Sequence, residues 1–290
     1  MTRIIPEKEL EKFIKSTGWV PGQEPFKSKT PPITEYKHSS EYGVDDILKG
    51  QQFYDDNLPD ALQQALDYVG VEGVVASMPY LIAGKSQAGK SNYLWKDWFT
   101  ALSEENIGVD KSGKFVAAGN PVVVTVHGGG LLTPERIKQA YSEGLINGSA
   151  KYSDDEFSNL LEGRLPSGDL IELYSFEKIK EGVSDLSHRF GVVMPYSTAQ
   201  NTESGYHKKK DFIQNPLVIA RAGGIENLEA YFDKAKDSDG EVGNHHPFKN
   251  RDASVPQGRV LFLNSNYNGL CGSNNLDSDG RFVGVAPEAP

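Results

Sequence analysis

The stretch from Gly84 to Ser91 reads Gly-Lys-Ser-Gln-Ala-Gly-Lys-Ser and matches the P-loop pattern at every position. In a P-loop, backbone N–H groups and the lysine cradle phosphate between a strand and a helix. The stretch follows an apolar run, Val71 to Ala83, that we expect to be a strand. Nucleotide hydrolysis also needs several parallel β-α units and an acidic Mg²⁺ ligand after a later strand, but Val122 to Val126 is followed by His127. We therefore expect a glycine- and lysine-rich surface turn and keep a P-loop nucleotide-binding protein as an alternative.

The sequence His127-Gly128-Gly129-Gly130 is similar to the oxyanion loop of lipase-type hydrolases, in which backbone N–H groups stabilise a developing negative charge. The matching nucleophile turn, Gly-x-Ser-x-Gly, occurs nowhere in the sequence. Acyl transfer would therefore lack its serine. We expect a tight strand-to-helix turn that ends at a helix capped by Thr133, no catalytic residues and no enzyme activity.

Two stretches near the C-terminus, Asn264 to Gly269 and Asn275 to Gly280, have the one-three-five-six spacing of a Ca²⁺ loop. Neither has the glutamate at position twelve, which falls on Asn275 in the first and on Ala286 in the second. The six histidines show no zinc spacing, and one cysteine cannot form a Cys-x-x-Cys cage. We predict no metal and no other cofactor, and a Ca²⁺-dependent lectin remains a second alternative.

The composition is that of a folded protein. The chain has 290 residues, 38% of them hydrophobic, and a net charge of −10 with a pI near 5.2. An acidic protein is a poor partner for phosphate backbones, so we expect no nucleic-acid partner. The N-terminus lacks a secretory signal, and the nearly apolar run from Val74 to Ala83 is about half a membrane span. We expect no membrane insertion and synthesis in the cytoplasm.

Local signals predict a helix that begins at Pro6 and ends at Gly18, followed by a proline-rich extended arm up to Tyr42. We therefore divide the chain into an N-terminal helix and arm, residues 1–45, and a domain, residues 46–290. Regular β-α alternation is absent, which favours an α+β fold with helices in the first half and short strands in the second. The predicted helices of the domain are Asp60 to Tyr68, Ser91 to Leu102, one from Thr133, and one from Ser153, which forms a capping box with Glu156, to Glu162.

Residues Asn264 to Gly280 differ from the rest of the chain, and we call them the asparagine block. They read Asn-Ser-Asn-Tyr-Asn-Gly-Leu-Cys-Gly-Ser-Asn-Asn-Leu-Asp-Ser-Asp-Gly between two predicted strands, Arg259 to Leu263 and Arg281 to Val285. The block contains no lysine, glutamate, glutamine, methionine or tryptophan. None of these can be reached from an asparagine codon by changing its first two bases, whereas every residue present can. The composition is also typical of antibody loops.

Through this block and the following Arg281-Phe282-Val283-Gly284-Val285, the sequence resembles the variable proteins of diversity-generating retroelements, in particular archaeal and archaeal-virus members. The resemblance covers the C-terminal part of the chain. It implies that a reverse transcriptase copies a template with adenine-directed errors into the 3′ end of the gene. It also implies a C-type lectin fold, in a variant like that of formylglycine-generating enzymes, with a helix-rich N-terminal part and a variable region at about 245–285.

The resemblance implies a set of variable, ligand-facing residues within the block. They are Ser265, Asn266, Tyr267, Asn268, Cys271, Ser273, Asn274, Asn275, Asp277, Ser278 and Asp279. We expect Leu270 and Leu276 to anchor the loops in the core. Gly269, Gly272 and Gly280 are either turn residues with positive φ or sampled variants.

The implied function is ligand binding, with receptor or surface recognition as its purpose. Exposed side chains must then stand on a backbone that other residues fix, for which we expect Val260, Phe262, Phe282 and Val283 on the flanking strands. The implied ligand is an unknown protein or glycan on a cell surface, and an oligomer or multivalent array would raise affinity. The resemblance places the protein on a virion or cell surface, while retention in the cytoplasm and an ordinary Asn/Gly-rich linker remain the simpler alternatives.

Overall fold

The computed structural model describes residues 43–264 and 268–287. The predicted helix from Pro6 and the arm up to Tyr42 lie outside the described residues, as do Ser265, Asn266 and Tyr267. All described residues belong to one unit of the chain, residues 38–290. The boundary predicted at residue 45 remains a prediction.

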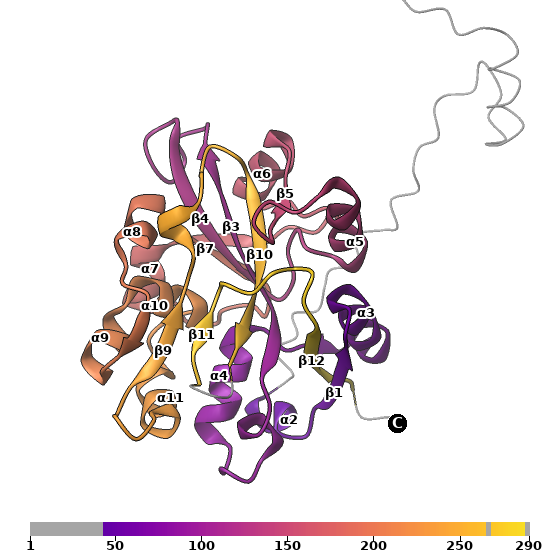
Figure 1. Cartoon of the computed structure of the whole chain (residues 1–290), viewed down its shortest axis with the longest axis vertical. Coiled ribbons are helices and arrows are strands. Elements are labelled where there is room, and N and C mark those ends of the chain that lie inside the picture. Colours follow the sequence, from indigo (N-terminus) through magenta and orange to yellow (C-terminus); the bar gives the residue numbers. More distant parts are fainter. Residues whose placement is uncertain (1–42, 265–267, 288–290) are drawn as a thin grey trace, which may run out of the picture. The chain divides into compact units, whose positions relative to one another are not determined.

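Two sheets organise the described residues (Figure 1). The small sheet has the order β1-β12-β2 and is antiparallel. The large sheet has the order β6-β7-β4-β3-β10-β11-β9-β8, with β5 paired to β10, and only the pairs β6/β7 and β11/β9 are parallel. The strands are β1 (Gln51–Asp55), β2 (Val74–Val75), β3 (Phe99–Asp110), β4 (Asn120–His127), β5 (Ala150–Lys151), β6 (Glu172–Ser175), β7 (Phe190–Pro195), β8 (Gly205–His207), β9 (Val242–His245), β10 (Gln257–Leu263), β11 (Leu270–Cys271) and β12 (Gly280–Val285).

Helices cover the sheets from several sides. Figure 1 shows α8 beside β4 and β7, α9 to α11 on the side of the molecule where β9 lies, and α3 beside β1 and β12. The helices are α2 (Val44–Ile47), α3 (Leu58–Val69), α4 (Met78–Gln87), α5 (Pro134–Glu143), α6 (Asp154–Leu161), α7 (Phe176–Glu181), α8 (Tyr196–Asn201), α9 (Lys209–Gln214), α10 (Pro216–Ala222) and α11 (Leu228–Ala235), with short 3₁₀ turns at Tyr93–Trp95 and Phe248–Asn250.

The large sheet is buried on both faces. Alternate residues of β4 enter two separate hydrophobic clusters, with Val123 in one and Val122, Val124 and Val126 in the other. The neighbouring β3 carries two buried carboxylates at its centre. Glu104 accepts hydrogen bonds from the backbone N–H groups of the turn after β4, and Glu105 pairs with an arginine of α10. Successive strand residues point to opposite faces, so these two carboxylates serve different sides of the sheet.

The predicted α+β class is confirmed, but the predicted distribution of elements is wrong. The two longest strands among the described residues, β3 and β4, lie in the first half, and α7 to α11 lie in the second. The strand predicted over Val71 to Ala83 is only β2, after which Pro79 lies in the first turn of α4. The helix predicted over Ser91 to Leu102 is a 3₁₀ turn followed by β3. Pairing of β3 with both β4 and β10 overrides the helical spacing there.

Predictions that rested on helix caps are confirmed. The helix predicted over Asp60 to Tyr68 lies within α3. Thr133 Oγ1 accepts a hydrogen bond from Arg136 N at 3.2 Å at the start of α5. At the start of α6, Ser153 and Glu156 form the predicted capping box, each side chain accepting a hydrogen bond from the backbone N–H of the other.

Candidate ligand-binding surface

The asparagine block crosses the interior of the large sheet and then runs along the molecular surface. The flanking strands were predicted correctly and are β10 and β12. Within the block, β11 lies between two strands, antiparallel to β10 (Phe262 opposite Cys271) and parallel to β9 (Cys271 opposite His245). Residues 272–279 then connect β11 to β12 without helix or strand. We call residues 273–279 the surface loop.

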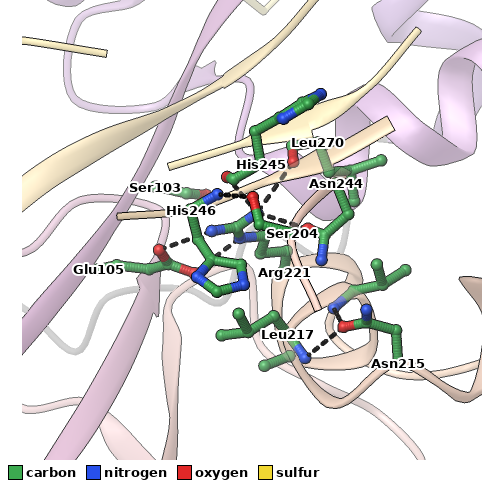
Figure 2. A network of polar contacts seen from close by, with 12 residues as sticks. Ser103, Glu105, Ser204, Asn215, Leu217, Arg221, Asn244, His245, His246 and Leu270 are labelled. Carbon is green, nitrogen blue, oxygen red and sulfur yellow. Dashed lines mark hydrogen bonds and ion pairs between the residues drawn. The ribbon is translucent and has the colours of Figure 1, made fainter. Parts of the chain in front are cut away.

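A buried ion pair supports β11 from the side of α10. Arg221 is 0% exposed, and its Nε and Nη2 donate to the two carboxylate oxygens of Glu105 at 2.7 and 2.8 Å. Its Nη1 donates to Asn244 Oδ1 at 2.6 Å and to the carbonyl oxygen of Leu270 at 2.9 Å. Figure 2 shows the guanidinium between Glu105, Asn244 and Leu270. The arginine therefore ties β3, β9 and the main chain of the block together.

Gly272 lies directly against this ion pair. Its N–H donates to the carbonyl of His245 at 3.0 Å. A Cβ atom at this position would lie 2.4 Å from Glu105 Oε2 and 2.6 Å from Arg221 Nη2, closer than any real contact. Gly280 is also packed closely, with a Cβ position 3.0 Å from Ala61 Cβ. Neither glycine has positive φ, so the explanation that they are turn residues with positive φ is wrong for both. Close packing is a physical reason for a glycine at each position.

The surface loop is held by its main chain. Arg259 Nη1 donates to the carbonyl of Ser273 at 2.9 Å, and burial lowers the pKa of this arginine to about 10 against the opposing effect of Asp277. Leu276 N donates to the carbonyl of Gly148 at 2.9 Å, and the Leu276 carbonyl accepts from the Tyr141 hydroxyl. The Ser278 carbonyl accepts from Leu58 N at 3.2 Å. These bonds involve peptide groups of the loop: every residue type supplies the carbonyl, and every type except proline supplies the N–H.

The two leucines of the block anchor it as predicted. Leu270 and Leu276 are both 0% exposed, one in each hydrophobic cluster. Of the four supporting residues expected on the flanking strands, Val260, Phe282 and Val283 are buried and Phe262 is half-buried. The leucines therefore attach the block to both sides of the large sheet.

The structure separates the predicted ligand-facing residues into three groups. Those at the surface are the exposed Ser273, Asn275 and Asp277 and the half-buried Asn274, Ser278 and Asp279. Asn268 is half-buried, and its side chain amide donates to the Ala235 carbonyl at 2.8 Å. Cys271 is 0% exposed, so the expectation that its side chain faces outward is wrong. It lies on β11, which has a strand on either side, and both residues of that strand are buried.

Three residues beside the surface loop were not identified from the sequence. Arg281 packs against two neighbouring aromatic rings, with its Cζ 5.0 Å from the Tyr54 centroid and 5.6 Å from the Trp98 centroid. The Tyr54 hydroxyl donates to Asp56 at 2.7 Å and lies 3.4 Å from Asp279 of the loop, and the bond to Asp56 is the main reason that its pKa is raised to about 12. Pairing of β1 with β12 places Tyr54 opposite Arg281. No local signal predicts that pairing.

The P-loop pattern does not form a P-loop. Gly84 to Gln87 are the last turn of α4, so the motif follows a helix and not a strand. A Cβ at Gly84 would lie 2.8 Å from Ile47 Cγ2, which shows that this glycine serves helix packing. Lys90 Nζ donates to the carbonyl of Lys234 and lies 3.8 Å from the Trp95 ring centroid. Neither its geometry nor its contacts are those of a phosphate cradle.

The interpretation of the glycine run after His127 as a strand-to-helix turn is confirmed. Gly128 and Gly129 have φ of 76° and 98°. The Gly128 N–H donates to the Leu102 carbonyl, and the N–H groups of Leu131 and Leu132 donate to Glu104 at 2.7 and 2.9 Å. These donors are therefore already engaged by the protein itself.

The described residues hold no group of three or more His, Cys, Asp or Glu side chains placed to bind a metal ion. His127 is buried with Ser103 Oγ 2.9 Å from its Nδ1 and the Ala220 carbonyl 2.9 Å from its Nε2, and burial lowers its pKa to about 4. A cavity of about 610 Å³ lies beside α5 and α6, and none of its lining residues belongs to the block. Over the described ranges, no helix combines the length and apolar character needed to cross a bilayer.

Comparison with known proteins supplies one solved structure. No protein-family model and no curated protein matches the sequence. The matching structure is that of a protein from Nanoarchaeota in which the C-type lectin fold accommodates massive sequence variation. The two chains are 31% identical with a TM-score of 0.63, and the match covers 81% of this chain and 97% of the other. The predicted C-type lectin fold is thus confirmed, and this chain belongs to the family of that nanoarchaeal C-type lectin-fold protein.

Proposed function

We propose that the chain is a binding protein whose surface loop is diversified to recognise different ligands. The observation that carries this proposal is the way the loop is held. Scaffold groups bind its peptide groups at Ser273, Leu276 and Ser278, while six side chains between 273 and 279 lie at least partly at the surface. In this arrangement the exposed side chains of the loop carry recognition, and its peptide groups carry the contacts that hold it in the fold.

This arrangement tolerates substitution for an energetic reason. Exposed substitutions usually change stability by within about 0.5 kcal/mol, whereas truncation of a buried leucine costs about 2–5 kcal/mol. A folded domain has only about 5–15 kcal/mol in total. Many simultaneous changes are therefore compatible with folding only where side chains contribute little to it, which describes Ser273, Asn275 and Asp277.

We further propose that the diversity arises by adenine-directed mutagenic retrohoming. Two observations support this origin. The block contains only residues that an asparagine codon yields through changes in its first two bases. The related nanoarchaeal protein accommodates massive sequence variation on the same fold.

The proposed ligand is a protein or glycan on a cell surface, and the proposed activity is binding without chemistry. Serine, asparagine and aspartate provide adaptable hydrogen bonding but little apolar area, so a single site would bind weakly. Display of several copies on a virion or a cell surface would raise the apparent affinity. The proposed P-loop alternative loses its structural basis because the motif is helical.

The test is a library randomised at Ser273, Asn274, Asn275, Asp277, Ser278 and Asp279 and displayed on yeast. We expect most members to be displayed at the level of the parent chain and selection on a model target, lysozyme, to yield binders. A matched library randomised at Leu270, Cys271, Gly272 and Leu276 should mostly fail to be displayed. Equal loss of display from both libraries would contradict the proposal.

The proposed origin has a separate test in the surrounding DNA. A near-copy of the 3′ end of the gene, differing almost only where the copy has adenine, should lie beside a reverse transcriptase gene. Sequencing of that neighbourhood decides the matter. A neighbourhood with neither element would contradict retrohoming while leaving the binding proposal to the library experiment.

A further inference from the structure

Lys85 is a buried lysine without a carboxylate partner within the described ranges. It lies on α4 and is 0% exposed. Its Nζ is 3.5 Å from Asn268 Oδ1 and 4.8 Å from the Trp95 ring centroid, and no ion pair involves it among residues 43–264 and 268–287. Burial, with a further contribution from Lys90, lowers the pKa of Lys85 to about 7. A buried ammonium with one long hydrogen bond is costly, so the residue that supplies that bond matters.

Asn268 supplies the bond from within the asparagine block, and three contacts fix it. Its Oδ1 faces Lys85, its Nδ2 donates to the Ala235 carbonyl at 2.8 Å, and its own carbonyl accepts from the Tyr231 hydroxyl. Its φ of 47° lies in the left-handed region, which asparagine, aspartate and glycine tolerate best. Asn268 is therefore one of the residues that an asparagine codon can yield, like the proposed variable residues. Its contacts, however, are those of a residue that holds the fold together.

We propose that Lys85 selects the residue at position 268, favouring the oxygen acceptors asparagine and aspartate and disfavouring the other residues that an asparagine codon can yield. Position 268 then does not belong to the freely exchangeable positions of the block. The idea that Lys85 limits which diversified sequences fold rests on the proposed function. The coupling between Lys85 and residue 268 does not, because it is a property of this one sequence.

The chemistry distinguishes the candidate residues. Glycine fits the backbone but leaves the ammonium without its acceptor, and alanine also loses the left-handed preference. Serine carries its oxygen one bond too close to the main chain to occupy the same place. Aspartate keeps the shape of asparagine and places a carboxylate near an ammonium that is already buried, but it loses the Nδ2 donor to the Ala235 carbonyl, so the charge attraction must offset one lost hydrogen bond. The free-energy cost of burying the lysine is already present in the parent chain. To this burial cost the substitution adds only the cost of burying the aspartate carboxylate.

The surroundings of Lys85 make an anion favourable. Lys90 follows α4, Lys234 lies on α11, and Lys90 has its pKa lowered by burial and by Lys234. Tyr231 on α11 donates to the Asn268 carbonyl, and burial, with a further contribution from Cys271 on β11, raises the pKa of Tyr231. Lys90 and Lys234 donate to main-chain carbonyls, and no ion pair joins them or Lys85 to a carboxylate among residues 43–264 and 268–287. A carboxylate at position 268 would add a negative charge beside Lys85.

The test is a double-mutant cycle on the full chain, read as the melting temperature at pH 6.5. We expect Asn268→Ala to lower Tm by about 2–4 °C or more and Asn268→Asp to lower it less, because the new ion pair with Lys85 offsets the lost hydrogen bond to Ala235. In the Lys85→Met background Asn268→Asp should lower Tm more than it does beside Lys85, because the carboxylate then lacks its cation. The matched control is Asn275→Asp, an exposed asparagine of the same block, which should not respond to Lys85→Met.

A pH series gives a second readout that loss of packing alone would not move. Because the pKa of Lys85 is about 7 in the folded chain and near 10.5 when unfolded, stability should rise with pH between those values. The rise should be smaller in Asn268→Asp, where the ion pair raises the folded pKa, and in Lys85→Met. Identical Tm changes at position 268 with and without Lys85, together with identical pH slopes, would overturn the proposal. Failure of the library experiment would leave this cycle unaffected, so the two failures are distinguishable.

Discussion

Two described segments of the asparagine block, residues 268–272 and residues 273–279, share the same codon character and differ in what surrounds them. Residues 268–272 pass through the large sheet, where Leu270 and Cys271 are fully buried and Gly272 touches the Arg221–Glu105 pair. Residues 273–279 run along the surface, where only Leu276 is fully buried. The comparison teaches that residues of one codon class can form a continuous segment and still divide into buried and exposed positions. Four predictions test how sharp that division is.

The largest effect is expected from the Arg221–Glu105 ion pair, which lies against residues 268–272. Arg221→Ala leaves Glu105 buried without its cation, which should cost about 3–5 kcal/mol of unfolding free energy. Urea denaturation measures the loss. Arg164→Ala is the control, because its pair with Glu162 is largely exposed, and it should cost less than about 1 kcal/mol. Similar costs for both variants would show that the block does not depend on the buried pair.

The leucine of the surface loop, Leu276, tests whether that loop needs its own anchor. Leu276→Ala should cost about 2–5 kcal/mol, because it leaves a cavity in the cluster that holds Leu276 and Phe282. Thermal unfolding followed by circular dichroism measures the loss. The neighbouring Asp277→Ala should be nearly silent. A silent Leu276→Ala would mean that main-chain bonds alone hold the loop.

Gly272 is the last buried residue before the surface loop, and Ser273 is the first exposed residue of the loop. Gly272→Ala should cost about 1–3 kcal/mol through overpacking, because the new methyl group would lie against Glu105 and Arg221. Ser273→Ala should change stability little. Gly272→Ala adds one methyl group and Ser273→Ala removes one hydroxyl group. The changes are similar in size, so the denaturation midpoints of the two variants can be compared directly. Equal midpoints would place the boundary elsewhere in the block.

The smallest effect is expected where diversity is proposed. Exchanging Ser273, Asn275 and Asp277 together for other small or aromatic residues should change the unfolding free energy by about 0.5 kcal/mol per position or less. Urea midpoints report the sum. A loss comparable to that of Leu276→Ala would remove the energetic basis of the proposed function.

Local chemistry allowed part of the fold to be predicted from the sequence. Thr133 and Ser153 cap helices with their own side chains, so the helix starts were readable within a few residues. Helical spacing of apolar residues gave a wrong helix over Ser91 to Leu102, where β3 begins. The central Glu104 and Glu105 of β3 are unusual residues for a buried strand, and no local pattern predicted one there. Their partners, the turn after β4 and Arg221, lie far away in the sequence.

The candidate site was predictable to a similar extent. Codon composition located the block, and the leucine spacing located its anchors. The burial of Cys271 depends on β9 and β10 lying on either side of β11, which no pattern within the block reveals. The placement of Tyr54 beside Asp279 likewise depends on β1 pairing with β12 from the other end of the domain.

The strand that follows the block, β12, has a consequence for chains in which the reading frame shifts within the block. β12 lies between β1 and β2 and contributes the fully buried Phe282 and Val283, so neither β1 nor β2 has its sheet partner until β12 has been translated in frame. A frameshift within the block replaces the sequence of β12. A chain with such a frameshift cannot complete the small sheet, so folding itself selects for chains that keep the reading frame through the block.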